Sequence, residues 1–363
     1  MQRTGQPATG RRARGRSDQS VAALDHLGAT VGAAGPAGAA GAAGPAGPAG
    51  EAGEDGLPGA DAPALEAAEL SCTGCHEDTG IIVSKNAQLA QSVHGAGGAY
   101  VRGSSERCAG CHGSEGPMAR IRAGGSPHDE SIVGVVNVSP YNCRTCHQIH
   151  TTYTEDDFNL EGDQAPVTLE MTGGTFDGGP GNLCVNCHQF RNELPVAVDG
   201  MIEIATTRFG PHYGAESQML LGEGGLGVTG SVSPHYEEVE GTCAGCHMGE
   251  ERNHTFVPAV SRCVTCHEGI DSFDLEGVQT EVEALMDELH ELLIGTGIID
   301  VTILDSETGE IGHRTVEGVY PEAVASAMWN YMFIYSEQSH GVHNPLFAKT
   351  LLTSSIEALT AAG

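Results

Sequence analysis

The chain has 363 residues, of which 48 are acidic and 17 are Lys or Arg, so its formal net charge is −31. A chain of this charge is not expected to bind nucleic acid, because phosphate contacts require basic side chains. No apolar run reaches the length of a transmembrane helix, so no membrane-spanning segment is predicted. The acidity would attract cationic partners, but we favour solubility or adaptation to a salty habitat as its explanation.

The first 65 residues are predicted to precede the folded part. Residues 1–31 contain five arginines and no hydrophobic periodicity, which predicts a disordered basic tail. A signal peptide is not visible, because the apolar stretch Val21–Leu24 is too short. In residues 32–65, Gly recurs at every third position from Gly32 to Gly59. We favour a linker for this collagen-like segment, and the alternative is a stalk that trimerises the chain.

One pentad, Cys-x-x-Cys-His, occurs six times and uses all 12 cysteines. Residues i and i+3 share a face of a helical turn, so both thiols can reach the vinyl groups of one porphyrin. The following histidine then binds the iron as its proximal ligand. The motif predicts six covalently bound c-type haems, with attachment at Cys72, Cys75, Cys108, Cys111, Cys143, Cys146, Cys184, Cys187, Cys243, Cys246, Cys263 and Cys266. The predicted proximal ligands are His76, His112, His147, His188, His247 and His267.

Zinc sites and disulfides explain the pentads poorly. A zinc site can use paired Cys-x-x-Cys segments, but it does not require His directly after each second Cys. Two cysteines three residues apart are rarely bridged, and a disulfide framework gives no reason for the recurring histidine.

The second axial ligand of each iron is sought among the 11 histidines outside the motifs. Methionine is the rival ligand type, but none of the 9 methionines recurs in a common context. Six histidines are ranked first from their positions in the sequence. Some lie in turn contexts, one lies between two close motifs and one precedes a helix cap. They are His94, His150, His212, His235, His254 and His343. We expect His150 to bind a neighbouring haem, because it follows His147 too closely to reach the same iron. The reserves are His128, His340 and His290, whereas His26 in the tail and His313 on an exposed turn are predicted bystanders.

The fold is predicted to be mainly α, with extensive irregular loops and a core filled by haem. Residues 66–270 form the haem-binding region, with a short helix at each motif and the last two motifs close in space. Residues 271–363 are predicted to pack on it as a helical region. Its expected helices contain a stripe from Leu275 to Leu293, residues 321–337 with Pro321 in the first turn, and a segment that Asn344 and Pro345 open. Segments 298–304 and 311–316 are expected to form a small β-hairpin.

Residues 71–363 as a whole resemble a multihaem c-type cytochrome. The segment from Cys243 through His254 to His267, and the segment Ser339-His-Gly-Val-His343-Asn-Pro345, are similar to the last motifs of the pentahaem nitrite reductase and octahaem hydroxylamine oxidoreductase superfamily. In that group the matching histidines are distal ligands, which implies this role for His254 and His343. The nitrite reductases commonly carry Cys-x-x-Cys-Lys at the catalytic haem, and this motif does not occur here.

An iron with two histidine ligands has no open position for a substrate, so the sequence predicts an electron carrier rather than a catalyst. We expect an exported protein, periplasmic or extracellular, because thioether attachment is made outside the cytoplasm. Its partners would be other redox proteins or an extracellular electron acceptor. The alternatives are a reductase of a small nitrogen or sulfur oxyanion with one open haem, and a homo-oligomer or filament built by haem stacking or by the Gly-x-y stalk.

Overall fold

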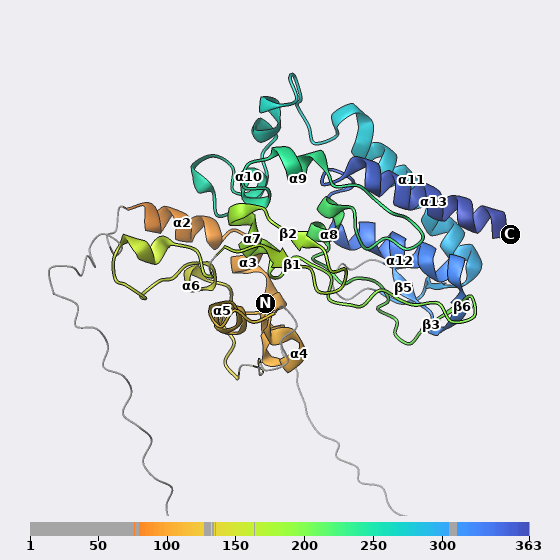
Figure 1. The fold of residues 1–363 in the computed structure, drawn as a ribbon, viewed down its shortest axis with the longest axis horizontal. Coiled ribbons are helices and arrows are strands. Elements are labelled where there is room, and N and C mark those ends of the chain that lie inside the picture. Colours follow the sequence, from red (N-terminus) through yellow and green to blue (C-terminus); the bar gives the residue numbers. More distant parts are fainter. Residues whose placement is uncertain are drawn as a thin grey trace, which may run out of the picture. The chain divides into compact units, whose positions relative to one another are not determined.

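The computed structural model describes residues 76, 80–126, 132, 134, 136–162, 164–304 and 311–362. The predicted tail with His26, the Gly-x-y segment, Cys72, Cys75 and His128 lie outside these residues. The described chain consists of short helices, long irregular loops and three two-stranded sheets (Figure 1). The expectation of a mainly α fold with extensive loops is confirmed.

Each motif that the structure describes in full forms about one helical turn. These turns are α4 (Glu106–Ala109), α6 (Cys143–Cys146), α7 (Asn182–Val185), α10 (Cys243–His247) and the 3₁₀ helix η5 (Val260–Thr265). In four of them the backbone N–H of the motif histidine donates to the carbonyl of the first cysteine at 2.8–2.9 Å, and α10 includes its histidine. This i to i−4 bond places both thiols on one face of the turn, as the attachment chemistry requires.

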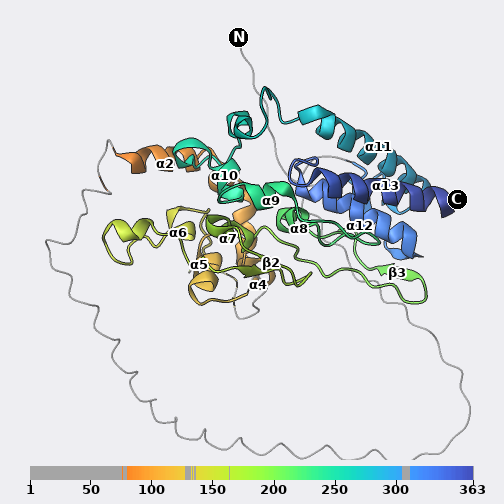
Figure 2. The same ribbon diagram turned by 45° about the horizontal axis from the view of Figure 1, so that its top comes forward.

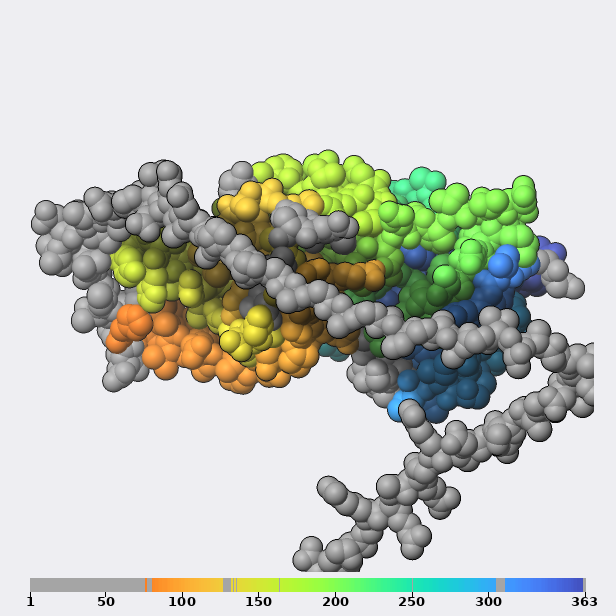
Figure 3. All heavy atoms as spheres, turned by 90° about the horizontal axis from the view of Figure 1, so that it is seen from below, coloured from red at the N-terminus to blue at the C-terminus, as the bar shows by residue number. Residues whose placement is uncertain are grey.

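The remaining elements of the motif region are short and connect these turns. The α-helices are α2 (Ile81–Leu89), α3 (Val93–Ala96), α5 (Glu115–Arg122), α8 (Glu216–Leu221) and α9 (Pro234–Glu238). The 3₁₀ helices are η1 (Gly98–Ser104), η2 (Glu155–Phe158), η3 (Gly179–Gly181) and η4 (Glu250–Arg252). Strand β1 (Val167–Thr168) pairs antiparallel with β2 (Thr175–Phe176). In Figure 3 the orange and yellow residues of this region lie on the left, and the blue C-terminal residues lie on the right.

The C-terminal region is built on three longer helices that lie side by side (Figure 2). They are α11 (Val278–Thr296), preceded by η6 (Leu275–Gly277), then α12 (Glu322–Glu337) and α13 (Pro345–Ala362). Their apolar faces enclose a side-chain core around Trp329, Phe333 and Leu351, which are at most 1% exposed. This core continues into residues before 270, because Phe190, Ile202, Ile204 and Met219 belong to the same cluster.

Two further strand pairs complete the fold. Strand β4 (Ile299–Asp300) pairs antiparallel with β5 (Arg314–Thr315), and Leu304 bridges to Ile311, so the predicted hairpin is confirmed. Strand β3 (Met201–Ile204) pairs with β6 (Gly318–Pro321), far along the chain, so local sequence patterns do not reveal this pair. Pro321 ends β6 and precedes α12 as its N-cap, so its predicted place inside the first turn is wrong. An extended backbone at Pro321 (ψ 141°) suits the end of a strand, which is why the helix begins one residue later.

Candidate haem sites

Each of the six motif histidines faces one other histidine. The ring centres in these pairs are 6.0–6.3 Å apart, and the rings are tilted or perpendicular rather than stacked. The pairs are His76–His150, His112–His212, His147–His254, His188–His94, His247–His343 and His267–His235. The six partners are the histidines that the sequence analysis ranks first as distal ligands. Iron binding by them stays a prediction at this point.

The distance within each pair suits two ligands of one ion. A metal–imidazole bond is about 2 Å long and the nitrogen lies roughly 1 Å from the ring centre, so two imidazoles on opposite sides of one ion have centres about 6 Å apart. Ordinary aromatic pairs cover a wider range, about 4.5–7 Å. The six pairs fall within 0.3 Å of one another and each contains one motif histidine. The residues therefore fit a bis-histidine haem iron at each site.

Hydrogen bonds fix the ring orientation in several pairs. The Nδ1 atoms of four histidines lie 2.7–3.0 Å from backbone carbonyl oxygens, so each Nδ1 carries the proton and donates. These donors are His147 to Phe158, His235 to Val342, His247 to Phe256 and His254 to Arg252. The Nε2 atom then keeps its lone pair, which is the form of imidazole that binds a metal.

Two other histidines donate from Nδ1 to carboxylates. His188 lies 3.1 Å from Glu216, and His343 is bonded to Glu337. The charge of Glu216 raises the pKa of His188 to about 9. Burial lowers the pKa of His343, but the charge and hydrogen bond of Glu337 outweigh it and raise that pKa to about 9. At His94, burial and then the nearby His188 lower the pKa to about 4, so this ring is neutral at pH 7.

The backbone at the partner histidines is shaped by local capping and by one buried carboxylate. His94 lies in α3 and His235 in α9, so the turns predicted there are wrong. Short helices form because Ser92 accepts from the N–H of Gly95, and Ser233 from the N–H of His235. His150 has a φ of 63°, and Asp157 holds its loop by accepting the backbone N–H groups of His150, Thr151, Thr152 and Tyr153 at 2.6–3.3 Å.

The thiols of neighbouring motifs lie close together. Cys111 and Cys187 interact by a hydrogen bond, and so do Cys184 and Cys243, while burial also raises the pKa of Cys111 and Cys184. The fourth motif is therefore next to both the second and the fifth. Cys246 lies within electrostatic reach of Cys263, and Arg262 donates to the carbonyl of Gly245 at 3.1 Å. This confirms that the last two motifs are neighbours in space.

A buried arginine joins two motifs, and the sequence alone does not reveal it. Arg120 is 0% exposed. It donates to the carbonyl oxygen of Gly110 at 2.9 Å and to that of Asn186 at 3.0 Å. Gly110 belongs to the second motif and Asn186 to the fourth. Its helix, α5, also carries the charged Glu115 and Arg122, so the local sequence does not single out Arg120, and most arginines are exposed.

The other described histidines lie outside the six pairs. His340 is bonded to Glu283 at 2.7 Å on the exposed surface. His290 contacts the carbonyl of Gly312 at 2.7 Å through Nε2 and stacks on His313, with ring centres 5.3 Å apart. The exposed position predicted for His313 is wrong, because two tyrosines of α12, Tyr331 and Tyr335, cover its ring. His313 stacks on Tyr335 at 4.2 Å and is bonded to the hydroxyl of Tyr331.

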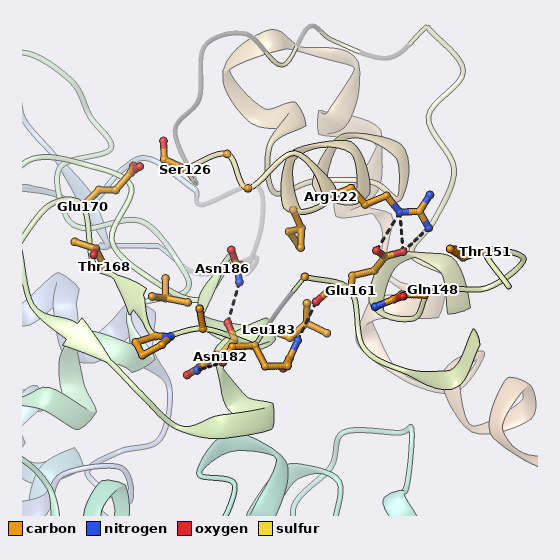
Figure 4. A pocket seen from close by; sticks show the side chains of 18 residues that line it. Arg122, Ser126, Gln148, Thr151, Glu161, Thr168, Glu170, Asn182, Leu183 and Asn186 are labelled. Carbon is orange, nitrogen blue, oxygen red and sulfur yellow. Dashed lines mark hydrogen bonds and ion pairs between the residues drawn. The ribbon is translucent and has the colours of Figure 1, made fainter. Parts of the chain in front are cut away.

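Two cavities differ in their relation to the histidine pairs. A cavity of about 230 Å³ is lined by Cys263, His235, His267 and the apolar Ile270, Phe273 and Val342. It holds both rings of one pair and a motif thiol beside apolar walls, as a porphyrin requires. A larger cavity of about 890 Å³ is more polar (Figure 4). The paired residues Arg122 and Glu161 lie on one side and Asn182 and Asn186 on another, and no histidine of the six pairs lines it.

Comparison with known proteins indicates the class to which the chain belongs. A family model described as cytochrome c3 matches residues 64–159, which include the first three motifs. The C-type polyheme cytochrome OmcB of Geobacter sulfurreducens is 23% identical over 353 residues, covering 79% of this chain and 43% of OmcB. OmcC of the same species is 24% identical over 243 residues, covering 52% of this chain and 31% of OmcC. The chain is a multihaem c-type cytochrome.

Covalently bound c-type haem is thus the cofactor of this cytochrome. The chain spans less than half the length of OmcB or OmcC. The crystal structure of the outer cell wall cytochrome OcwA resembles it with a TM-score of 0.49 and 19% identity, covering 76% of this chain and 50% of OcwA. Among the described residues, no helix combines the length and apolar character needed to cross a lipid bilayer.

Proposed function

We propose that this cytochrome holds six haems, each attached by one Cys-x-x-Cys-His motif and ligated by one of the six histidine pairs. The observation that carries the proposal is the uniform separation of 6.0–6.3 Å within those pairs. Cys72, Cys75 and the ten later cysteines would form the thioethers. His94, His150, His212, His235, His254 and His343 would be the distal ligands.

We infer from this ligation that the protein transfers electrons. When bound, haem iron gains and loses single electrons. The Nδ1 hydrogen bonds orient the histidines of the pairs. With both histidines of a pair as ligands, the iron would have no position left for a substrate. The second, fourth and fifth motifs lie next to each other, so haems attached there would be close enough to exchange electrons.

We also infer that the protein works outside the cytoplasm, because thioether attachment of haem is made there. Its partners would be other redox proteins or an extracellular electron acceptor. OmcB and OmcC are more than twice as long as their matched segments. Electron transfer is therefore proposed here for the chain that we describe.

Intact mass and low-temperature EPR of the oxidised holoprotein test the proposal. The mass should exceed that of the polypeptide by six haems, and every EPR signal should be low-spin. Substituting His343→Ala should convert one haem to a high-spin form that binds carbon monoxide, while His340→Ala, a matched control outside the pairs, should leave all six signals unchanged.

Two results would overturn the proposal. A mature protein with five haems or fewer would refute the assignment of all six motifs. A stoichiometric high-spin haem in the unmodified protein that binds nitrite and reduces it would replace electron transfer by a reductase activity.

A further inference from the structure

Two of the six histidine pairs contain a ring held by a carboxylate instead of a carbonyl. In the pairs of His147 with His254 and of His267 with His235, the Nδ1 hydrogen bonds that we observe all go to backbone carbonyl oxygens. In contrast, His188 donates to Glu216 and His343 donates to Glu337. The sites therefore differ in the charge placed next to their ligands.

The two carboxylates lie at opposite ends of their helices. Glu337 ends α12 (Figure 1), and its side chain is 0% exposed. One of its oxygens accepts from His343, and the other accepts from the N–H and the hydroxyl of Ser339 at 3.1 and 2.8 Å. Glu216 lies in the first turn of α8 with its side chain 26% exposed. Both carboxylates already accept the Nδ1 hydrogen bond of their histidine.

The two sites are also neighbours. Cys184, in the motif of His188, lies next to Cys243, in the motif of His247, and His247 pairs with His343. Glu216 acts electrostatically on His343 as well as on His188. Glu216 thus adds negative charge to both sites, and Glu337 adds it to the site of His343.

A carboxylate acceptor changes the ligand more than a carbonyl does. A charge-assisted hydrogen bond draws the Nδ1 proton further from the ring, so the imidazole becomes a more basic ligand. A fixed negative charge close to the iron also favours the ferric over the ferrous iron. Both effects lower the reduction potential of the iron that the histidine binds.

We propose that Glu216 and Glu337 are positioning residues that lower the reduction potentials of the haems at His188 and His343 below those at His147 and His235. The inference rests on the bis-histidine ligation proposed above. It assigns an adjacent low-potential pair to the fourth and fifth motifs.

A redox titration of the full holoprotein, followed by EPR of each low-spin signal, tests this assignment. Glu216→Gln and Glu337→Gln keep the side-chain shape and leave an oxygen to accept from Nδ1, but they remove the charge. Each should shift one of the lowest midpoint potentials to a more positive value and change the g-anisotropy of one signal, with smaller shifts at the neighbouring site. Glu283→Gln removes a carboxylate from His340, which is outside the pairs, and should shift none.

The direction of the shift separates tuning from general loosening. A loosened site admits water, which favours the ferric iron and shifts the potential to a more negative value. Glu216 is partly exposed, so its variants should fold even where Glu337→Gln does not, and Glu216→Asp should give a smaller shift than Glu216→Gln because it keeps the charge. Unchanged or more negative potentials in Glu216→Gln, with six low-spin haems present, would overturn the inference alone. A high-spin haem in the unmodified protein would instead refute the function on which it rests.

Discussion

The motif region and the C-terminal helices bury different kinds of side chain. Between residues 80 and 166, the buried side chains that the structure describes are mostly small or polar, as at Ala109, Arg120, Asp157 and Glu161. Around α11, α12 and α13 the buried side chains are large and apolar, with Trp329 among them. A region with little apolar side-chain core needs another apolar body to stabilise it, and haem supplies one. The C-terminal region has a side-chain core of its own.

The largest expected effect comes from withholding haem. Chain produced without haem attachment should lose amide protection throughout residues 80–166, because few buried apolar side chains remain to stabilise that region. Helices α11 to α13 should keep partial protection. Hydrogen exchange measured by mass spectrometry gives both regions in one experiment. Equal loss in the two regions would show that the C-terminal core also depends on haem.

A truncated side chain in the C-terminal core should destabilise that core and leave the haem sites unchanged. Phe333 is 0% exposed and packs on Phe190, with ring centres 4.8 Å apart. Phe333→Ala should lower the free energy of unfolding by about 3–5 kcal/mol, while the low-spin EPR signals remain as they are. Leu346→Ala is the control on α13. Leu346 is 66% exposed, so this substitution should change the free energy of unfolding little. A lost low-spin signal in Phe333→Ala would contradict the separation of the two regions.

A smaller effect is expected from the polar interactions of the motif region. Asp157→Asn replaces one carboxylate oxygen by an amide that cannot accept the N–H groups of the His150 loop. The free energy of unfolding should fall by roughly 1–3 kcal/mol. The site of His76 and His150 should be disturbed before the others, as followed by its EPR signal during thermal unfolding. An unchanged melting curve would show that the loop is held by other contacts.

The same carboxylate predicts a pH dependence. Burial raises the pKa of Asp157, but the hydrogen bonds from the backbone and hydroxyl of Thr152 and from the N–H groups of His150 and Thr151 outweigh it and hold the pKa below its ordinary value of 3.8. Its stabilisation is therefore fully present above about pH 4 and is lost as the pH falls through the folded-state pKa. The Asn variant should show a weaker loss over that range than the parent protein.

The smallest effect is expected at His313. Its stacking on Tyr335 and its bond to Tyr331 should be worth about 1–2 kcal/mol, so His313→Ala should lower the melting temperature slightly. All haem signals should remain, since His313 lies outside the six pairs. Loss of any low-spin signal in His313→Ala would instead indicate that His313 is a haem ligand.

Short-range patterns predict much of this molecule. The five-residue motif, the helix opened by Asn344 and Pro345 and the hairpin around residues 299–315 each depend on neighbours in the sequence. The partner histidines could be ranked because a limited number of histidines lie outside the motifs and some have distinctive contexts. The helices at His94 and His235 were not predictable from those contexts, since one serine cap decides between a turn and a short helix.

Long-range polar contacts account for most of what the sequence does not reveal. Glu216 is one of 48 acidic residues, and nothing nearby in the sequence connects it with His188. Arg120 and Asp157 are likewise recognised only when the chain is folded and their burial is known. For Glu337 a local signal exists, because Ser339 and His343 follow it closely, but the sequence does not show that the three converge.

The spacing of the histidine pairs along the chain has a consequence for biosynthesis. His94 precedes His188, so the fourth site has both rings as soon as its own motif is synthesised. The fifth site lacks His343 until the start of α13 has been made and exported. If haem is ligated as proposed and is attached while the chain crosses the membrane from its N-terminus, the fourth haem would have both ligands at once, whereas the fifth would stay exposed to small ligands until residue 343 has crossed.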